Sequence, residues 1–184
     1  MLGTTKIYGC LADPIDHVKA PTIFTSIFKE KNIDAVMVPI HVEKDNLKNV
    51  IASLKKINNF QGMTVTIPHK TTIANLCEYL EQDAGFTKSV NWIKFDKDRK
   101  LIGNNFDGQG FVAGFLSQNF LIKNKKICIF GAGGAAVSIA CSLAKQKIKS
   151  LKIINRNIDK ANELMKKIKV IDDNLIVKVI GYQD

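Results

Sequence analysis

Residues 125–157 read KKICIFGAGGAAVSIACSLAKQKIKSLKIINRN, in which two apolar runs flank a glycine-rich turn and a stretch of small and apolar residues. The apolar run from Ile127 to Phe130 predicts a short strand that passes directly into the glycine-rich turn at 131–136. The apolar residues after the turn, at 137, 140, 141 and 144, have helical spacing. A second strand is predicted at 151–154, and strand, turn, helix and strand together have the size of a unit that binds a dinucleotide.

The glycines of this turn have a chemical reason. Gly131 permits the tight turn, Gly133 lets the backbone approach a pyrophosphate, and Ala136 keeps the helix close to its strand. The helix N-terminus offers free N–H groups to phosphate oxygens. The motif alone also fits a helix that starts in a crowded turn. The strands predicted on both sides of it favour the interpretation that it binds a nucleotide. The predicted cofactor-binding residues are Gly131, Ala132, Gly133, Gly134, Ala135, Asn155, Arg156, Asn157 and Lys160.

The end of the second strand predicts which nucleotide is bound. It reads Asn155-Arg156-Asn157, where an NAD-binding protein usually carries an acid for the ribose hydroxyls. Residues 145–169 contain nine Lys or Arg and two Asp or Glu, so 9 − 2 = +7 of the total charge of +10 falls in this segment. Part of this charge is typical of a solvated helix face. The missing acid and the basic surroundings favour a 2′-phosphate, and therefore NADP.

Composition excludes several other classes of protein. The chain has 184 residues, 46% of them hydrophobic, which suits one domain or two small ones. Its aromatic residues are not interleaved with the basic ones, so no nucleic-acid partner is predicted. No signal pattern or membrane-spanning apolar run is present, and we expect a cytoplasmic monomer or homodimer without a membrane partner. The cysteines lack the close spacing of metal or redox sites, so we predict no metal and four reduced core residues, Cys10, Cys77, Cys128 and Cys141.

Strands and helices alternate along the chain, which predicts an α/β fold with mostly parallel sheets. Strands are predicted at 6–11, 35–41, 62–67, 89–95, 100–104 and 175–182. Helices are predicted from Pro21 through Phe28 and at 45–57, 71–80, 108–120 and 158–168, with Asp107 as an N-cap. We place a domain boundary between residues 1–120 and 121–184. A complete dinucleotide fold has two halves, so we expect the native chain to continue beyond Asp184.

Four ordered stretches resemble the shikimate dehydrogenase family. They are GCLADPIDHVKAP at 9–21, GMTVTIPHK at 62–70, SVNW at 89–92 with NNFDGQGF at 104–111, and GAGGAA at 131–136 with NRN at 155–157. The resemblance implies an N-terminal α/β substrate-binding domain, a Rossmann-type NADP-binding domain and a site in the cleft between them. It also implies an enzyme of aromatic amino acid biosynthesis that interconverts shikimate, a cyclic hydroxy acid, and its ketone 3-dehydroshikimate with NADP.

By position, the resemblance makes Lys70 and Asp107 the catalytic pair, and Thr66 and Asn91 substrate-binding residues. The chemistry is consistent with these roles, because oxidising a secondary alcohol requires a group that handles the hydroxyl proton. On the residues alone, the preferred interpretation is that Lys70 is a surface lysine at a helix start and that Asp107 is only a cap.

The sequence departs from the family where the substrate carboxylate is bound. Val18 and Ala20 occupy the positions of two serines, and Trp92 follows Asn91 where the family has threonine. Losing two hydrogen bonds to a charged group, at roughly 1.5–3 kcal/mol each, would weaken shikimate binding. Two alternatives therefore stay open. One is a diverged enzyme for quinate or another polyol acid, and the other is a nucleotide-binding paralogue without catalytic activity.

Overall fold

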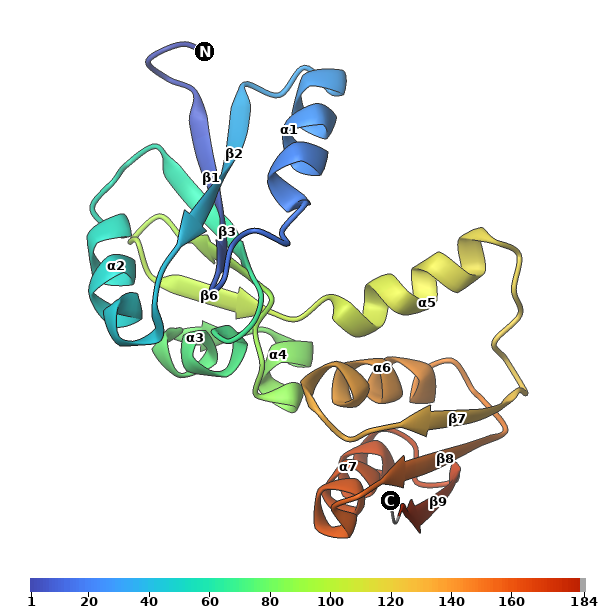
Figure 1. Ribbon diagram of the computed structural model, residues 1–184. Coiled ribbons are helices and arrows are strands. Elements are labelled where there is room, and N and C mark those ends of the chain that lie inside the picture. Colours follow the sequence, from blue (N-terminus) through green and yellow to red (C-terminus); the bar gives the residue numbers. More distant parts are fainter. Residues whose placement is uncertain (183–184) are drawn as a thin grey trace. The chain divides into compact units, whose positions relative to one another are not determined.

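The computed structural model describes residues 1–182 (Figure 1). These residues form two compact units, the first from Met1 to Asn105 and the second beginning at Phe106. The predicted α/β architecture is confirmed, because each unit combines helices with a sheet that contains parallel strands. We describe each unit by itself.

A six-stranded sheet forms the centre of the first unit, in the order β2-β1-β3-β5-β6-β4. The strands β2, β1 and β3 are parallel, β5 runs antiparallel to both β3 and β6, and β4 is parallel to β6. Their bounds are β1 (Lys6–Ala12), β2 (Ala35–His41), β3 (Phe60–Val65), β4 (Tyr79–Leu80), β5 (Trp92–Phe95) and β6 (Leu101–Asn104).

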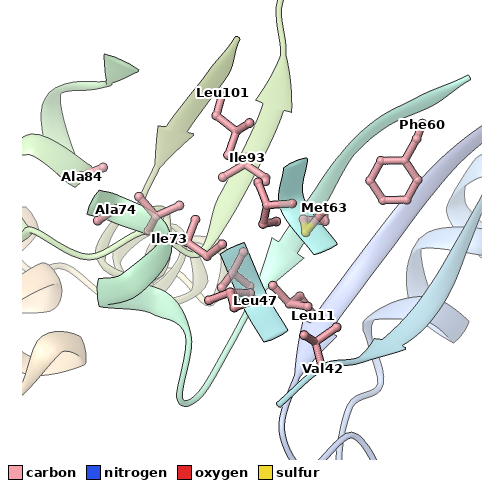
Figure 2. Close-up of a cluster of buried hydrophobic side chains, with 13 residues drawn as sticks. Leu11, Val42, Leu47, Phe60, Met63, Ile73, Ala74, Ala84, Ile93 and Leu101 are labelled. Carbon is pink, nitrogen blue, oxygen red and sulfur yellow. The ribbon is translucent and has the colours of Figure 1, made fainter. Parts of the chain in front are cut away.

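Three helices cover one face of this sheet, and a fourth packs on the opposite face. On the first face, the buried side chains of Leu47 and Ile73 pack against Leu11, Met63 and Ile93 (Figure 2). On the other face, the ring of Phe28 lies 5.3 Å from that of Tyr8. The helices are α1 (Ala20–Glu30) on that other face, and α2 (Leu47–Leu54), α3 (Lys70–Leu76) and α4 (Gln82–Thr87) on the first, with a 3-10 turn at Lys44–Asn46 before α2.

The second unit contains a three-stranded parallel sheet in the order β7-β8-β9. Small residues let α6 pack closely, and its buried Ala140 and Ala144 join Leu151 and Ile153 of β8 and Leu164 of α7 in one core. Figure 1 shows α5 beside α6 within this unit. The bounds are α5 (Asp107–Ser117), β7 (Lys126–Phe130), α6 (Gly134–Ala144), β8 (Ser150–Asn155), α7 (Ile158–Ile171) and β9 (Ile176–Gly181).

The region from Thr71 to Thr87 differs from the sequence prediction. The helix predicted at 71–80 ends at Leu76, because Cys77 is extended with φ −72° and ψ 133°. Tyr79 and Leu80 then pair with Ile102 and Gly103 as β4, and α4 follows. The prediction was wrong here because strand pairing with β6, a contact distant in sequence, overrides the local helical pattern.

The division between the units also lies elsewhere than the predicted boundary at residues 120/121. The structure divides the chain between Asn105 and Phe106, because α5 packs on α6 and belongs to the second unit. Asp107 was predicted to cap this helix, but Phe106 is the N-cap and Asp107 is already the first helical residue. Its carboxylate still lies in the first turn, where the helix dipole favours negative charge.

Cys128 is exposed, so its prediction as a core residue is wrong. Its neighbours Ile127 and Ile129 pack against the core, so the alternation of β7 turns Cys128 to the opposite face of the sheet. Cys10 and Cys141 are buried, and Cys77 is half-buried. Among residues 1–182, no helix is long and apolar enough to cross a membrane.

Candidate active site residues

The glycine turn leaves the start of α6 open. The backbone N–H of Gly131 donates to the carbonyl of Ile154 (2.8 Å), and this hydrogen bond links the first residue of the turn to β8. Gly131 has φ +104°, a region that side-chain-bearing residues rarely adopt. Gly133 is the N-cap of α6, and no described atom outside its chain neighbours lies within 4 Å of a Cβ placed there. The exposed start of α6 therefore leaves room for a ligand to approach its first backbone N–H groups.

The end of β8 is held in shape by two asparagines. The Asn155 side-chain amide donates to the carbonyl of Asn157 (2.7 Å), and the Asn157 side chain accepts from the backbone N–H of Lys160 (2.9 Å). Asn157 is thus the N-cap of α7, a role that the sequence prediction did not give it. The side chains of Arg156 and Lys160 are exposed at this turn, close in sequence to the cap. The turn presents two cations near the carboxyl end of β8.

In the first unit, backbone hydrogen bonds bring Thr66, Lys70 and Asn91 to one edge of the sheet. Thr66 directly follows β3, and Val65 donates its N–H to the carbonyl of Asn91 (2.8 Å). Lys70 begins α3, and its carbonyl accepts from the N–H of Val90 (3.0 Å). All three residues are half-buried. Three of the predicted site residues are therefore neighbours, although 25 positions separate Thr66 from Asn91 in sequence.

A residue that the sequence prediction missed supports this edge. His69 is fully buried, and its Nε2 lies 2.8 Å from the carbonyl of Val42. Because a carbonyl oxygen can only accept, Nε2 donates to Val42, and within residues 1–182 Nδ1 has no hydrogen-bond partner. This contact joins the start of α3, and hence Lys70, to the segment after β2. No periodicity marks His69 as buried, and its position beside Lys70 is its only signal.

Val18 lies in the segment between β1 and α1, and Ala20 is the first residue of α1. Asp13 opens this segment, and its N–H donates to the carbonyl of Ile67 (3.2 Å), next to Thr66. Its carboxylate lies 2.9 Å from Nε2 of His41 at the end of β2. Val18 and Ala20 are both half-buried. The segment therefore starts at the same sheet edge as Thr66, and apolar side chains occupy both Val18 within it and Ala20 directly after it.

Asp107 lies in the second unit, whereas Lys70 lies in the first. Asp107 is half-buried at the start of α5, and the N–H of its neighbour Gly108 donates to Oγ of Ser138 in α6 (2.9 Å). This contact attaches the aspartate's turn to the helix that follows the glycine turn. Among the described residues, no group of three or more His, Cys, Asp or Glu side chains is placed to hold a metal ion.

Two family models match the chain, one in each unit. Residues 10–93 match the shikimate dehydrogenase substrate binding domain, and residues 116–178 match shikimate/quinate 5-dehydrogenase. The chain belongs to the shikimate dehydrogenase family. The resemblance inferred from the four sequence stretches is thereby confirmed.

Curated members of the shikimate dehydrogenase family align over most of the chain. It is 35% identical to "Shikimate dehydrogenase (NADP(+))" of Nitrosopumilus maritimus, over 96% of this chain and 65% of that protein. It is 39% identical to the protein of the same name from Methanosphaera stadtmanae, over 91% and 58%. The chain spans about 57–65% of the length of the curated relatives it matches.

Solved shikimate dehydrogenases have the same fold. Shikimate 5-dehydrogenase from Listeria monocytogenes, in complex with shikimate and NAD, has a TM-score of 0.89 and 29% identity, and the match covers 98% of this chain and 63% of that one. A shikimate dehydrogenase in complex with NADP⁺ has a TM-score of 0.85 and 34% identity, with 97% and 63% covered.

Proposed function

We propose that the protein is an NADP-dependent oxidoreductase that interconverts shikimate and 3-dehydroshikimate. The observation that carries this proposal is the grouping of Thr66, Lys70 and Asn91 at one sheet edge, in a chain of the shikimate dehydrogenase family. The curated relatives are named shikimate dehydrogenase (NADP(+)), which supports both the reaction and the cofactor. On this proposal the first unit binds the substrate and the second binds the nucleotide.

The second unit would hold the cofactor. Backbone N–H groups at the start of α6 suit a pyrophosphate, and Arg156 with Lys160 suits a 2′-phosphate. No Asp or Glu follows β8 at the position where an acid would bind a 2′-hydroxyl. NADP⁺, when bound, supplies the acceptor for the hydride that leaves the substrate carbon. We expect NADP to bind at least tenfold more tightly than NAD, and Arg156→Ala to remove most of that preference.

Lys70 and Asp107 would handle the hydroxyl proton. As the hydride leaves the carbon, the hydroxyl must lose its proton for the carbonyl to form, and a lysine amine or a carboxylate can accept and pass on that proton. Thr66 and Asn91 would bind substrate hydroxyl groups through their side-chain oxygen and amide. Lys70→Ala is expected to lower kcat by at least a hundredfold, the scale of a lost general acid or base, with little change in NADP affinity.

The apolar side chains of Val18 and Ala20 favour a second candidate substrate. Neither side chain can donate a hydrogen bond, so the alternative is a diverged family member that does not rely on the serine pair and acts on quinate or another polyol acid. In that case a panel of shikimate, quinate and related polyols would show the highest kcat/KM with a compound other than shikimate. Val18→Ser with Ala20→Ser is expected to lower KM for shikimate, because the serines would bind the ground state and the transition state of the substrate alike. The affinity for NADP should not change.

The deciding experiment is a steady-state assay of the full-length protein with NADP and NAD over this panel. Turnover of shikimate that depends on Lys70 supports the proposal. Tight NADP binding with no turnover of any panel member would instead indicate a nucleotide-binding paralogue without catalytic activity. The cytoplasmic location, the monomeric or dimeric state and the absence of a nucleic-acid partner stay predictions.

A further inference from the structure

The first turn of α5 is attached to α6 by an unusually close contact. Gly108 is buried and its N–H donates to Oγ of Ser138 (2.9 Å), while Ser138 is only 2% exposed. A Cβ added to Gly108 would lie 2.1 Å from the carbonyl oxygen of Ser138 and 2.4 Å from Oγ of Ser142. Glycine is therefore required at 108 for the two helices to approach this closely.

The contact links two functional features of the proposed enzyme. Gly108 directly follows Asp107, and both lie in the first turn of α5. Ser138 lies in the second turn of α6, five residues after the N-cap Gly133 of the glycine turn. The hydroxyl of Ser138 therefore connects the backbone beside Asp107 to the helix that would bind the pyrophosphate.

We propose that Ser138 is a positioning residue for Asp107. Its hydroxyl accepts the Gly108 N–H and fixes the direction in which the first turn of α5 presents the carboxylate relative to the glycine turn. This inference rests on the proposed function, since it takes Asp107 to be catalytic. It accounts for a buried polar contact beside the apolar cluster to which Val112 of α5 and Ala140 of α6 belong.

Ser142 offers a matched control one turn further along α6. It is also buried (5% exposed) and faces Gly108, but Gly108 donates to Ser138. Ser138→Ala and Ser142→Ala remove the same atom from the same helix face. Only Ser138→Ala leaves the Gly108 N–H without its acceptor, so Ser142→Ala controls for the loss of a buried hydroxyl from this helix face.

The experiment measures steady-state kinetics of full-length wild-type, Ser138→Ala, Ser142→Ala and Asp107→Asn proteins. We expect Ser138→Ala to lower kcat about tenfold, the scale of one lost buried hydrogen bond, and Ser142→Ala to lower it less than twofold. KM for NADP should change less than twofold in both. A substrate deuterated at the oxidised carbon should show a larger isotope effect on kcat in Ser138→Ala, because slower chemistry limits turnover more.

The controls separate failure of this inference from failure of the proposed function. If Asp107→Asn keeps wild-type turnover, the catalytic role of Asp107 is wrong. If Asp107→Asn loses turnover but Ser138→Ala matches Ser142→Ala in kcat and isotope effect, Ser138 does not position it. Thermal unfolding is recorded for each variant. Ser138→Ala is expected to melt at a lower temperature than Ser142→Ala because it leaves a buried N–H unpaired, so the kinetics are compared at a temperature at which both variants are folded.

Discussion

The Arg99→Ala substitution is expected to lower the free energy of unfolding of the first unit by about 2–3 kcal/mol. The reason is that the Arg99 side chain caps the C-terminal end of α2. The guanidinium donates to the carbonyls of Leu54 (3.1 Å), Lys55 (2.9 Å) and Ile57 (2.8 Å), and lies 4.2 Å from the ring centre of Phe95. Carbonyls at a helix C-terminus have no partner within the helix. Three bonds at about 1 kcal/mol each, plus about 0.5 kcal/mol for the ring contact, give about 3.5 kcal/mol. We lower this sum because Arg99 is half-exposed.

Two further substitutions at this position test the reasoning. Arg99→Lys keeps the charge, but a single ammonium does not reproduce the planar fork, so we expect about half of the loss. Arg99 has φ +59°, a left-handed conformation that glycine adopts without cost. Arg99→Gly should therefore be about 1 kcal/mol more stable than Arg99→Ala, although both lose every side-chain bond.

The assay is urea unfolding followed by the fluorescence of Trp92, the only tryptophan of the sequence, which lies in β5 of the same unit. A free-energy change for Arg99→Ala below about 0.5 kcal/mol would show that water replaces the guanidinium without loss. If Arg99→Gly is no more stable than Arg99→Ala, the left-handed backbone conformation at residue 99 does not affect the free energy of unfolding.

Two other predictions concern pH and the glycine turn. Burial tends to raise the pKa of Glu78, but hydrogen bonds from Lys55 and from the N–H of Leu101 (2.6 Å) outweigh it and lower the pKa below its ordinary value of 4.5. The stabilisation that ionised Glu78 contributes is therefore complete above pH 4.5 and is lost as the pH falls through the lowered pKa. Glu78→Gln should therefore flatten the acid side of a plot of unfolding free energy against pH. Gly131→Ala should cost about 1–2 kcal/mol in thermal unfolding because of its positive φ, whereas Gly133→Ala should keep the stability and weaken NADP binding. Equal stability losses at the two glycines would contradict this reading.

The sequence by itself predicted the elements whose signals are local. The strand before the glycine turn, the turn and the helix after it, at 127–144, are all present where expected, since apolar spacing and glycines act within a few residues. The strand at Ala35–His41 was predicted to the residue because its apolar run is short and bounded. Motif order was enough to predict the family, which the matches to both units confirm.

Tertiary structure alone decided the features that depend on contacts between distant residues. Tyr79 and Leu80 form a strand only because β6 pairs with them, and Phe106 begins the second unit only because α5 packs on α6. The burial of His69 and the contact between Gly108 and Ser138 follow from the same cause, since 27 and 30 positions separate the paired residues. Local patterns specify a helix or strand, but which side chains meet is set by packing free energy summed over the whole unit.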